Sequence, residues 1–250
     1  MMATMTLTRV AHASVLLDFD GHRVLTDPWF SEKPGYHQGE ARPYATAAEL
    51  PELAGVVVSH GHYDHFDLDA FTAYPDKTVS MVVKRGLGDR ARAAGFPNVT
   101  ELDPWQSTTL GPVQVTAAPA KHAVPEVTYL LQAGRKTVFF GGDTLRVPEL
   151  DEIPGRFGDL DLALLPINGL TIRPLLNKQV VMTAAEAAEL TAALRPRLAV
   201  PIHYAFTAGP IRDRLLLKMD GRTSLFVDAV ADHAPDTDVH VLAPGEPLPV

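Results

Sequence analysis

Short apolar runs alternate with polar loops along the whole chain, a pattern typical of a protein built on many β-strands. Three pairs of these runs flank short turn sequences, such as Asp20-Gly21, and are predicted to form β-hairpins. The paired runs are 15–19 with 23–26, 108–110 with 113–117, and 127–131 with 136–140. The runs predicted to be buried interior strands are 53–58, 79–83, 160–165 and 198–202.

Two helices are predicted from their start and stop signals. Thr183 begins the stronger one, because Glu186 lies three residues further on and completes a capping box before an alanine-rich stretch that runs to Leu194. The other is predicted around 87–94 and ends at Gly95.

The order of these elements repeats once along the chain. Each half, roughly 1–120 and 121–250, begins with hairpin strands and then passes to strand–helix units. This repeat predicts a single α/β domain in which two β-sheets pack together and helices cover their outer faces. The first residues, Met1–Val10, are polar and mixed, and the Pro-rich tail 243–249 is expected to be a closing loop.

Composition narrows the class of protein. At 250 residues with 46% hydrophobic residues, the chain has enough apolar material for a substantial core. The formal net charge is 22 − 30 = −8 and no basic run occurs, so no nucleic-acid partner is expected. No apolar run is long enough to span a membrane and no signal peptide is recognised, which favours a cytoplasmic protein. Cysteine is absent, so any bound metal must be held by nitrogen and oxygen atoms.

Four metal-ligand side chains occur within six residues: His60, His62, Asp64 and His65. Three imidazoles and a carboxylate packed this tightly repel one another when protonated, and they leave lone pairs to satisfy when buried. A transition-metal ion removes both problems. The pattern H-x-H-x-D-H would arise by chance in about one in a thousand chains of this composition. The segment therefore predicts a metal site.

Three more potential ligands lie beyond the ends of predicted strands. Asp143 and His203 each follow a buried strand, as His60 does, and His122 follows a hairpin strand. Strand ends of this kind can meet along one rim of a sheet. Taken singly, these residues fit a turn aspartate, a core histidine and a surface histidine equally well. Taken together, they supply the ligands that the cluster lacks for a second metal.

Asp27 ends a predicted strand just before Pro28. It is expected either to be a turn residue or to orient a ligand histidine through the far nitrogen of its ring. The remaining histidines have no comparable context. His22 and His240 are expected to be structural and His37 to be a loop residue, and nothing is assigned to His12 and His233.

The order of these residues resembles the metallo-β-lactamase-fold superfamily over essentially the whole chain. The resemblance rests on His60-x-His62-x-Asp64-His65, His122, Gly142-Asp143 and His203, with Leu25-Thr-Asp27-Pro as the early Asp motif. Leu165-Pro-Ile-Asn, Met182-Thr-Ala-Ala-Glu-Ala-Ala and Pro201-Ile-His-Tyr are similar to the branch of L-ascorbate-6-phosphate lactonase-like hydrolases. Ser59-His-Gly-His-Tyr-Asp-His is also similar to the N-acyl-phosphatidylethanolamine-hydrolysing phospholipase D group. The resemblance implies a four-layer αββα sandwich.

The resemblance also implies a ligand set and a chemistry. One metal would be held by His60, His62 and His122, the second by Asp64, His65 and His203, and Asp143 would bridge both. A hydroxide held between the two ions would attack a carbonyl carbon or a phosphorus, and Asp64 would pass its proton to the leaving group. The implied activity is hydrolysis of a small-molecule ester, lactone or phosphodiester. Zinc is the first expectation for both ions, with manganese or iron as alternatives.

Two loops, 30–45 and 170–181, are expected to shape the substrate pocket. Arg173 and Lys178 in the second loop fit contacts to a phosphate or carboxylate, and they also fit solvated loop charges. Tyr204 adjoins His203 and is open to the same two interpretations.

Two other functions stay open from the sequence: a mononuclear iron oxygenase of the same fold, and a non-catalytic metal-binding protein. The complete second ligand set argues against the first, and the presence of Asp64 argues against the second. His62 stands where flavodiiron-type members carry Glu, and the lack of Cys disfavours the Cys-ligated β-lactamases. The sequence does not predict an oligomeric state.

Overall fold

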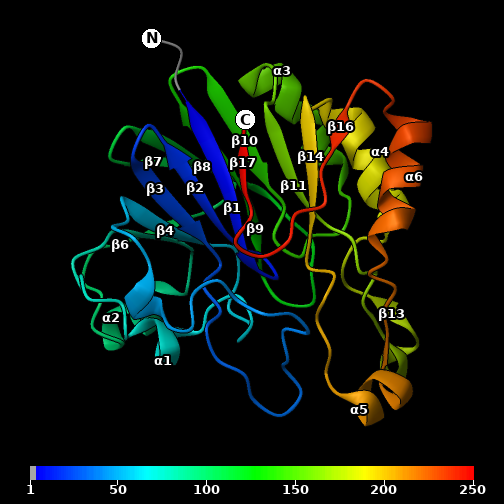
Figure 1. Ribbon diagram of the computed structural model, residues 1–250, viewed down its shortest axis with the longest axis horizontal. Helices are drawn as coiled ribbons and strands as arrows, with labels where there is room; N and C mark the ends of the chain where they lie inside the picture. The colour runs from blue at the N-terminus through cyan, green and yellow to red at the C-terminus, as the bar shows by residue number, and fades with distance from the viewer. Residues whose placement is uncertain (1–3) are drawn as a thin grey trace.

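Two seven-stranded β-sheets packed face to face form the centre of the protein in the computed structural model, which describes residues 4–250 (Figure 1). The first sheet has the strand order β17-β1-β2-β3-β4-β5-β6, and the second has the order β16-β14-β11-β10-β9-β8-β7. In each sheet the strands on one side are antiparallel and those on the other side are parallel. The two sheets therefore share one plan.

Ten of the fourteen strands in these two sheets follow the predicted apolar runs, whereas β1, β6, β16 and β17 were not predicted. In the first sheet they are β1 (Met5–Ala11), β2 (Ser14–Phe19), β3 (His22–Thr26), β4 (Gly55–Val58), β5 (Met81–Lys84), β6 (Val99–Leu102) and β17 (Pro247–Pro249). In the second they are β7 (Ser107–Leu110), β8 (Val113–Pro119), β9 (Val127–Ala133), β10 (Lys136–Phe140), β11 (Leu162–Pro166), β14 (Leu198–Ile202) and β16 (Asp238–Val239). The three predicted hairpins are confirmed as β2–β3, β7–β8 and β9–β10.

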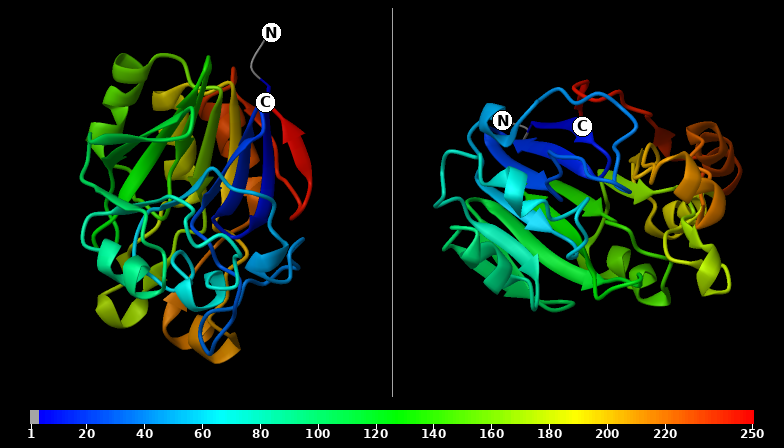
Figure 2. Two further views of the ribbon diagram at one scale, coloured as in Figure 1. Left: turned by 90° about the vertical axis from the view of Figure 1, so that its left-hand side faces the viewer. Right: turned by 90° about the horizontal axis from the view of Figure 1, so that it is seen from below.

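Helices cover both outer faces and complete four layers (Figure 2). The first sheet is covered by α1 (Leu68–Phe71) and α2 (Gly88–Ala93), and the second by α3 (Ile153–Phe157), α4 (Ala184–Leu194) and α6 (Thr223–His233). β4, β11 and β14 are buried along their whole length because both faces of each sheet are covered, which explains their continuous apolar sequences. The protein is thus an α/β sandwich of αββα layers, as the sequence and its resemblance predicted.

Helix α4 begins where the sequence predicted. The hydroxyl of Thr183 accepts a hydrogen bond from the backbone N–H of Glu186 at 3.2 Å, and the Glu186 carboxylate accepts one from the Thr183 N–H at 2.8 Å.

A small three-stranded sheet of order β13-β12-β15 lies outside the sandwich. Its strands are β12 (Thr171–Ile172), β13 (Lys178–Gln179) and β15 (Leu217–Lys218), beside η3 (Arg173–Leu175) and α5 (Pro210–Leu215). Single 3₁₀ turns, η1 (Ala47–Glu49) and η2 (Pro148–Glu152), complete the elements.

The two chain ends differ from the expectation. Met1–Ala3 lie outside the described residues, and Met5–Ala11, for which no strand was predicted, forms β1. The expectation of a closing loop over 243–249 is wrong in its last part, because Pro247–Pro249 forms the edge strand β17 against β1. An edge strand tolerates proline, since its outward N–H groups need no partner. Among residues 4–250, no helix has both the length and the apolar character that crossing a bilayer requires.

Candidate metal centre

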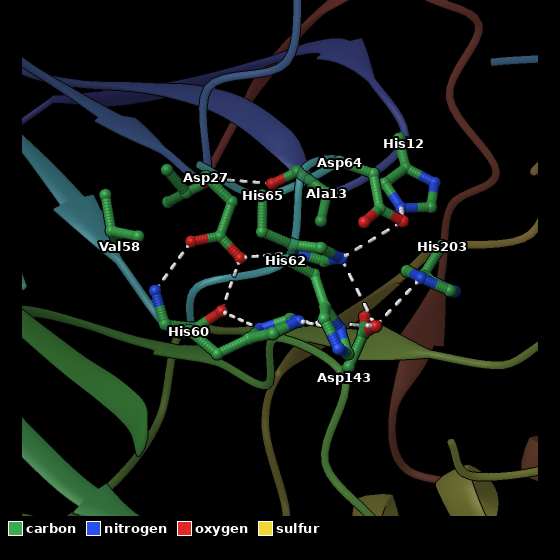
Figure 3. A network of polar contacts seen from close by, with 12 residues as sticks. His12, Ala13, Asp27, Val58, His60, His62, Asp64, His65, Asp143 and His203 are labelled. Carbon is green, nitrogen blue, oxygen red and sulfur yellow. Dashed lines mark hydrogen bonds and ion pairs between the residues drawn. The ribbon is translucent and has the colours of Figure 1, made fainter. Parts of the chain in front are cut away.

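The seven predicted ligands meet at one end of the sandwich. The segment that holds His60 to His65 follows β4, while Asp143 follows β10 and His203 follows β14. His122 lies in the loop after β8. These strand ends lie on the same rim, so side chains that are far apart in the sequence point into one space (Figure 3).

Three imidazoles form the first group. The Nε2 of His60 lies 2.9 Å from the Nδ1 of His62, and the Nε2 of His122 lies 3.1 Å from that same Nδ1. The nearer carboxylate oxygen of Asp143 lies 3.9 Å from His60 and 3.8 Å from His122. Ligands at about 2.05 Å from a zinc ion in a tetrahedron lie about 3.3 Å apart, so this group has the dimensions of a metal site.

The second group surrounds the same carboxylate oxygen. The Oδ2 of Asp143 lies 3.2 Å from the Nε2 of His65 and 3.0 Å from the Nε2 of His203. The Oδ2 of Asp64 lies 3.8 Å from the Nε2 of His65. Asp143 therefore stands between the two groups, as Figure 3 shows.

Several buried polar atoms of this site have no hydrogen-bond partner within the protein. They include the Nε2 of His65, the Oδ1 of Asp143 and both ring nitrogens of His12. A buried polar atom without a partner destabilises a protein by about 1–3 kcal/mol. Divalent metal ions would satisfy such atoms, and nitrogen and carboxylate oxygen are their common ligands. The residues present thus fit a metal centre.

The far ring nitrogens of two predicted ligands, His65 and His122, are held by other groups. The Nδ1 of His65 lies 2.7 Å from the Oδ2 of Asp27, and the Nδ1 of His122 donates to the carbonyl of Val180 at 2.7 Å. Asp27 also accepts hydrogen bonds from the backbone N–H and the hydroxyl of Ser59. Such partners fix the orientation and tautomer of a ligand ring. Asp27 therefore lies where it can orient the ring of His65, which is one of the two roles expected for it from the sequence.

Backbone strain is concentrated at the same place. His12, Asp27 and His203 have φ values of 55°, 33° and 55°, in the left-handed region that residues with a side chain rarely adopt. Strain of this kind persists only where surrounding structure fixes it, and it clusters at functional sites. Gly142 has φ 54°, and the site has no room for a side chain there, because a Cβ would lie 2.4 Å from the Oε1 of Glu126.

Sequence reasoning missed two buried residues of the centre. His12 follows β1, and its Nε2 lies 3.3 Å from the Oδ2 of Asp64. Its ring centroid lies 4.0 Å from that of His203. Glu126 precedes β9, accepts a hydrogen bond from the backbone N–H of Asp143 at 2.7 Å, and lies 3.3 Å from the Nδ1 of His60.

In the metal-free site, three histidine rings are held in their neutral form. Burial, together with the charges of neighbouring imidazoles, lowers the pKa of His12, His60 and His62 to about 3 each, so these rings are neutral at pH 7. Neutral imidazole is the form that binds metal.

The carboxylates of the site behave differently from one another. Burial opposes ionisation of Asp64 and Asp143, but nearby histidines outweigh it and lower the pKa of both carboxyl groups. Burial likewise opposes the charge on His65, but Asp143 and Asp64 outweigh it and raise the pKa of this ring. Burial raises the pKa of Glu126 to about 8. The two ionised aspartates therefore supply negative charge for cations.

A cavity of about 400 Å³ opens onto the centre. His62, Asp64, His122, Asp143 and His203 reach it from the centre. Its other walls are mostly apolar, with Gly35 and Tyr36 from the loop 30–45, Leu170, Ile172 and Val180 from the segment 170–181, and Phe206, Arg212 and Leu217 from the segment after His203. Both loops named from the sequence therefore contribute to the cavity.

The expected substrate contacts lie elsewhere. Arg173 and Lys178 are exposed and do not line the cavity, and the Nε of Arg173 donates to the carbonyl of Leu217. Tyr204 also faces away, because its ring lies under the guanidinium of Arg9 and its hydroxyl bonds the carbonyl of Leu242. The cation on the cavity wall is Arg212, which the sequence reasoning did not single out.

Comparison with curated proteins gives relatives of several kinds. The chain is 34% identical over 173 residues to an uncharacterized protein of Mycobacterium tuberculosis, a match that covers 62% of this chain but only 46% of that protein. It is 27% identical to a UPF0173 metal-dependent hydrolase of Anaeromyxobacter dehalogenans, with 97% and 85% of the two chains covered. It is also 27% identical to an N-acyl-phosphatidylethanolamine-hydrolyzing phospholipase D of Caenorhabditis elegans, with 87% and 70% covered.

Solved structures share the fold. A metallo hydrolase from Ignicoccus hospitalis superposes with a TM-score of 0.76 at 22% identity, covering 99% of this chain and 98% of the other. A diiron β-hydroxylase from Streptomyces venezuelae gives a TM-score of 0.78 at 20% identity and covers all of this chain but 55% of the other. At these identities the likeness concerns the fold alone. The family model described as a beta-lactamase superfamily domain matches residues 22–204, a range that contains all the predicted ligands from His60 to His203. The chain therefore belongs to the β-lactamase superfamily, in a group whose relatives include metal-dependent hydrolases.

Proposed function

We propose that the protein is a dinuclear metal-dependent hydrolase that cleaves a small-molecule ester, lactone or phosphodiester. The observation that carries the proposal is the position of Asp143, whose Oδ2 stands between two groups of ligands. His60, His62 and His122 would hold one ion, Asp64, His65 and His203 would hold the other, and Asp143 would belong to both. Zinc is proposed for both positions, with manganese or iron as alternatives.

Two ions held in this way would lower the pKa of water toward about 7 and polarise the oxygen of a substrate. The protein itself orients the rings of the candidate ligands and lines the cavity with apolar side chains. Asp27 fixes the ring of His65, and the carbonyl of Val180 fixes that of His122. Asp64 is ionised, reaches the cavity and can accept a proton from the attacking water, and the Nε2 of His12 lies 3.3 Å from its Oδ2. Phe206 and Leu217 line the cavity with apolar surface, which disfavours bulk water beside the reacting atoms.

Metal content and turnover test this function together. The metal-loaded protein is assayed on a generic phosphodiester and a generic lactone, beside Asp64→Asn and the control Asp69→Asn, an exposed residue of α1. We expect about two ions per chain, turnover of one substrate class, and a loss of roughly 10²–10⁴-fold in Asp64→Asn alone, the range for a lost general base.

Other results of these assays would contradict the hydrolase proposal or replace it with an alternative. One redox-active iron per chain with oxygen consumption and no hydrolysis would replace the proposal with the oxygenase alternative. A folded protein that binds no metal, or full hydrolysis by Asp64→Asn, would contradict it. Metal binding by wild type with no turnover of any ester would favour a non-catalytic metal-binding protein.

A further inference from the structure

Exposed apolar side chains gather at one end of the molecule, beside the cavity. Among the described residues, five of the eight exposed large apolar side chains lie in two short segments, 173–178 and 210–218, here called the apolar tip. They are Leu175, Leu176, Ile211, Leu215 and Leu216, with Leu176 96% exposed and Ile211 74% exposed. Concentration of exposed apolar surface in one place marks an interaction site.

The two segments of the tip are joined by the small sheet. β12 pairs with β15, and the backbone N–H of Arg173 donates to the carbonyl of Leu216 at 2.8 Å. Figure 1 shows α5 and β13 together at the lower right, away from the sheet sandwich. The tip is therefore one surface rather than two separate loops.

The backbone at Leu176 is also strained. Leu176 and Asn177 both have φ 56°, the left-handed conformation that suits glycine or asparagine and strains a leucine. A leucine that is strained and almost wholly exposed contributes nothing to packing within the chain. Its side chain is available to a partner.

The tip is basic although the chain is acidic. It carries Arg173, Lys178, Arg212, Arg214 and Lys218 against the single carboxylate of Asp213, a formal charge of 5 − 1 = +4, in a chain of −8. That carboxylate is engaged within the protein by the N–H of Ala208 and the hydroxyl of Thr207. Within residues 4–250 these cations form no ion pair. Exposed leucines among such cations suit a lipid layer, which is apolar inside and negatively charged at its surface.

The tip is continuous with the cavity. Arg212, Leu216 and Leu217 belong to both, and Ile172 of β12 lines the cavity directly before the tip begins at Arg173. An apolar molecule that leaves a lipid layer at the tip would meet an apolar wall up to the metal centre. The geometry thus connects the surface of the tip with the candidate ligands.

We propose that the apolar tip docks on an anionic lipid surface, and that the centre acts on an amphiphile drawn from that surface. The docking stands on the tip alone, and the substrate class rests on the proposed function. A second copy of this chain fits less well, because two-fold packing would place a +4 surface against another +4 surface.

Vesicle binding tests the docking without reference to catalysis. Metal-loaded protein is sedimented with vesicles of phosphatidylcholine alone and of phosphatidylcholine with phosphatidylglycerol. We expect binding to the anionic vesicles that weakens at high salt, and little binding to the neutral ones. The double variant Leu176→Ser/Ile211→Ser is expected to bind at least tenfold more weakly, whereas the control Val227→Ser/Val241→Ser, also exposed but outside the tip, binds as wild type does.

Charge is tested in the same assay. Arg214→Gln is expected to weaken binding to the anionic vesicles, and Arg135→Gln, an exposed arginine in the β9–β10 turn, is not. Absence of vesicle binding, or equal binding by the Leu176/Ile211 variant, overturns the proposal. So does a wild-type dimer that this variant converts to a monomer in light scattering, because the tip would then be a subunit interface.

Metal content and turnover of a water-soluble ester separate this proposal from the function proposed above. The tip variants are expected to keep both, since Leu176 and Ile211 touch no ligand of the centre. If every ester fails while vesicle binding follows the tip, the hydrolase proposal is wrong and the docking remains. If a soluble ester is cleaved but vesicle binding is absent, the docking is wrong and the hydrolase remains.

Discussion

His12 and Glu126 are the two buried residues of the centre that lie outside every recognised motif. His12 touches Asp64, and Glu126 touches both His60 and the backbone of Asp143. Each is fully or almost fully buried, so its contacts are shielded from water and act strongly on its neighbours. Both residues are therefore expected to tune the ligands that they contact.

Replacing His12 by phenylalanine keeps an aromatic ring against Trp29, whose ring centroid lies 4.9 Å away, but removes the nitrogen beside Asp64. We expect the affinity for the second metal to fall by roughly 10–100-fold, the usual effect of removing a group that holds a ligand. Calorimetric titration of the metal-free protein measures this, with the exposed His240→Phe as control. Unchanged affinity at both sites would show that His12 only fills space.

The raised pKa of Glu126, from 4.5 to about 8, predicts a pH dependence of stability in metal-free protein. The protonated form is favoured in the folded state, so its contribution is complete below pH 4.5 and is lost as the pH rises through 8. Glu126→Gln removes this titration while keeping the acceptor for the N–H of Asp143. The melting temperature of wild type, measured relative to that of the variant, should therefore fall between pH 5 and pH 9. Parallel curves would contradict the shifted pKa.

The candidate ligands could be found from the sequence to different degrees, for physical reasons. His60 to His65 form a local motif, and Asp143 and His203 follow continuous apolar strands. His12 follows β1 in the same way, but β1 was not recognised, so the rule was not applied to it. Glu126 has no local signal, because the residues that it contacts lie far from it in the sequence and are brought near only by the fold.

At the scale of elements, the strands and helices that could be predicted are those whose own sequence carries a start, stop or turn signal. The hairpins have turn residues, and α4 has a capping box. In contrast, α6 has no side-chain cap, and only Phe226 and Val230 are buried. In β1, Met5 and Leu7 alternate with half-exposed Thr6 and Thr8, which reads as a mixed sequence when the partner strands are unknown. β17 contains two prolines and is a strand only because β1 offers an edge.

The capping box of α4 gives a prediction at this scale. Thr183→Ala removes the acceptor for the N–H of Glu186 and should lower the free energy of unfolding by about 1 kcal/mol. In a chain of this size the melting temperature should fall by roughly 2–4 °C. Ser224→Ala, at an exposed position of α6, is the control and should melt like wild type. Equal melting of the two variants would contradict a role for the cap.

At the scale of the whole molecule, the candidate centre joins the two sheets. His60, His62, Asp64 and His65 come from the loop after a strand of the first sheet, whereas Asp143 and His203 follow strands of the second. Bound ions would therefore stabilise the packing of one sheet on the other, and not only the local loops.

Removal of metal by a chelator is expected to lower the melting temperature. An ion present at about a thousand times its dissociation constant stabilises the folded state by about 4 kcal/mol per site, which corresponds to roughly 8–16 °C in a chain of this size. Calorimetry with and without chelator measures the shift, and His203→Ala should show a smaller one. If chelation changes neither melting nor activity, the centre does not bind metal as proposed.

The distribution of the candidate ligands along the chain also sets when the complete centre can form during synthesis. Between His60 and His203 the ribosome adds 143 residues, which takes about 7–30 s at typical rates of elongation. During that interval His60 and His62 are made, but the last candidate ligand, His203, is not. The complete centre can therefore take up both ions only late in translation.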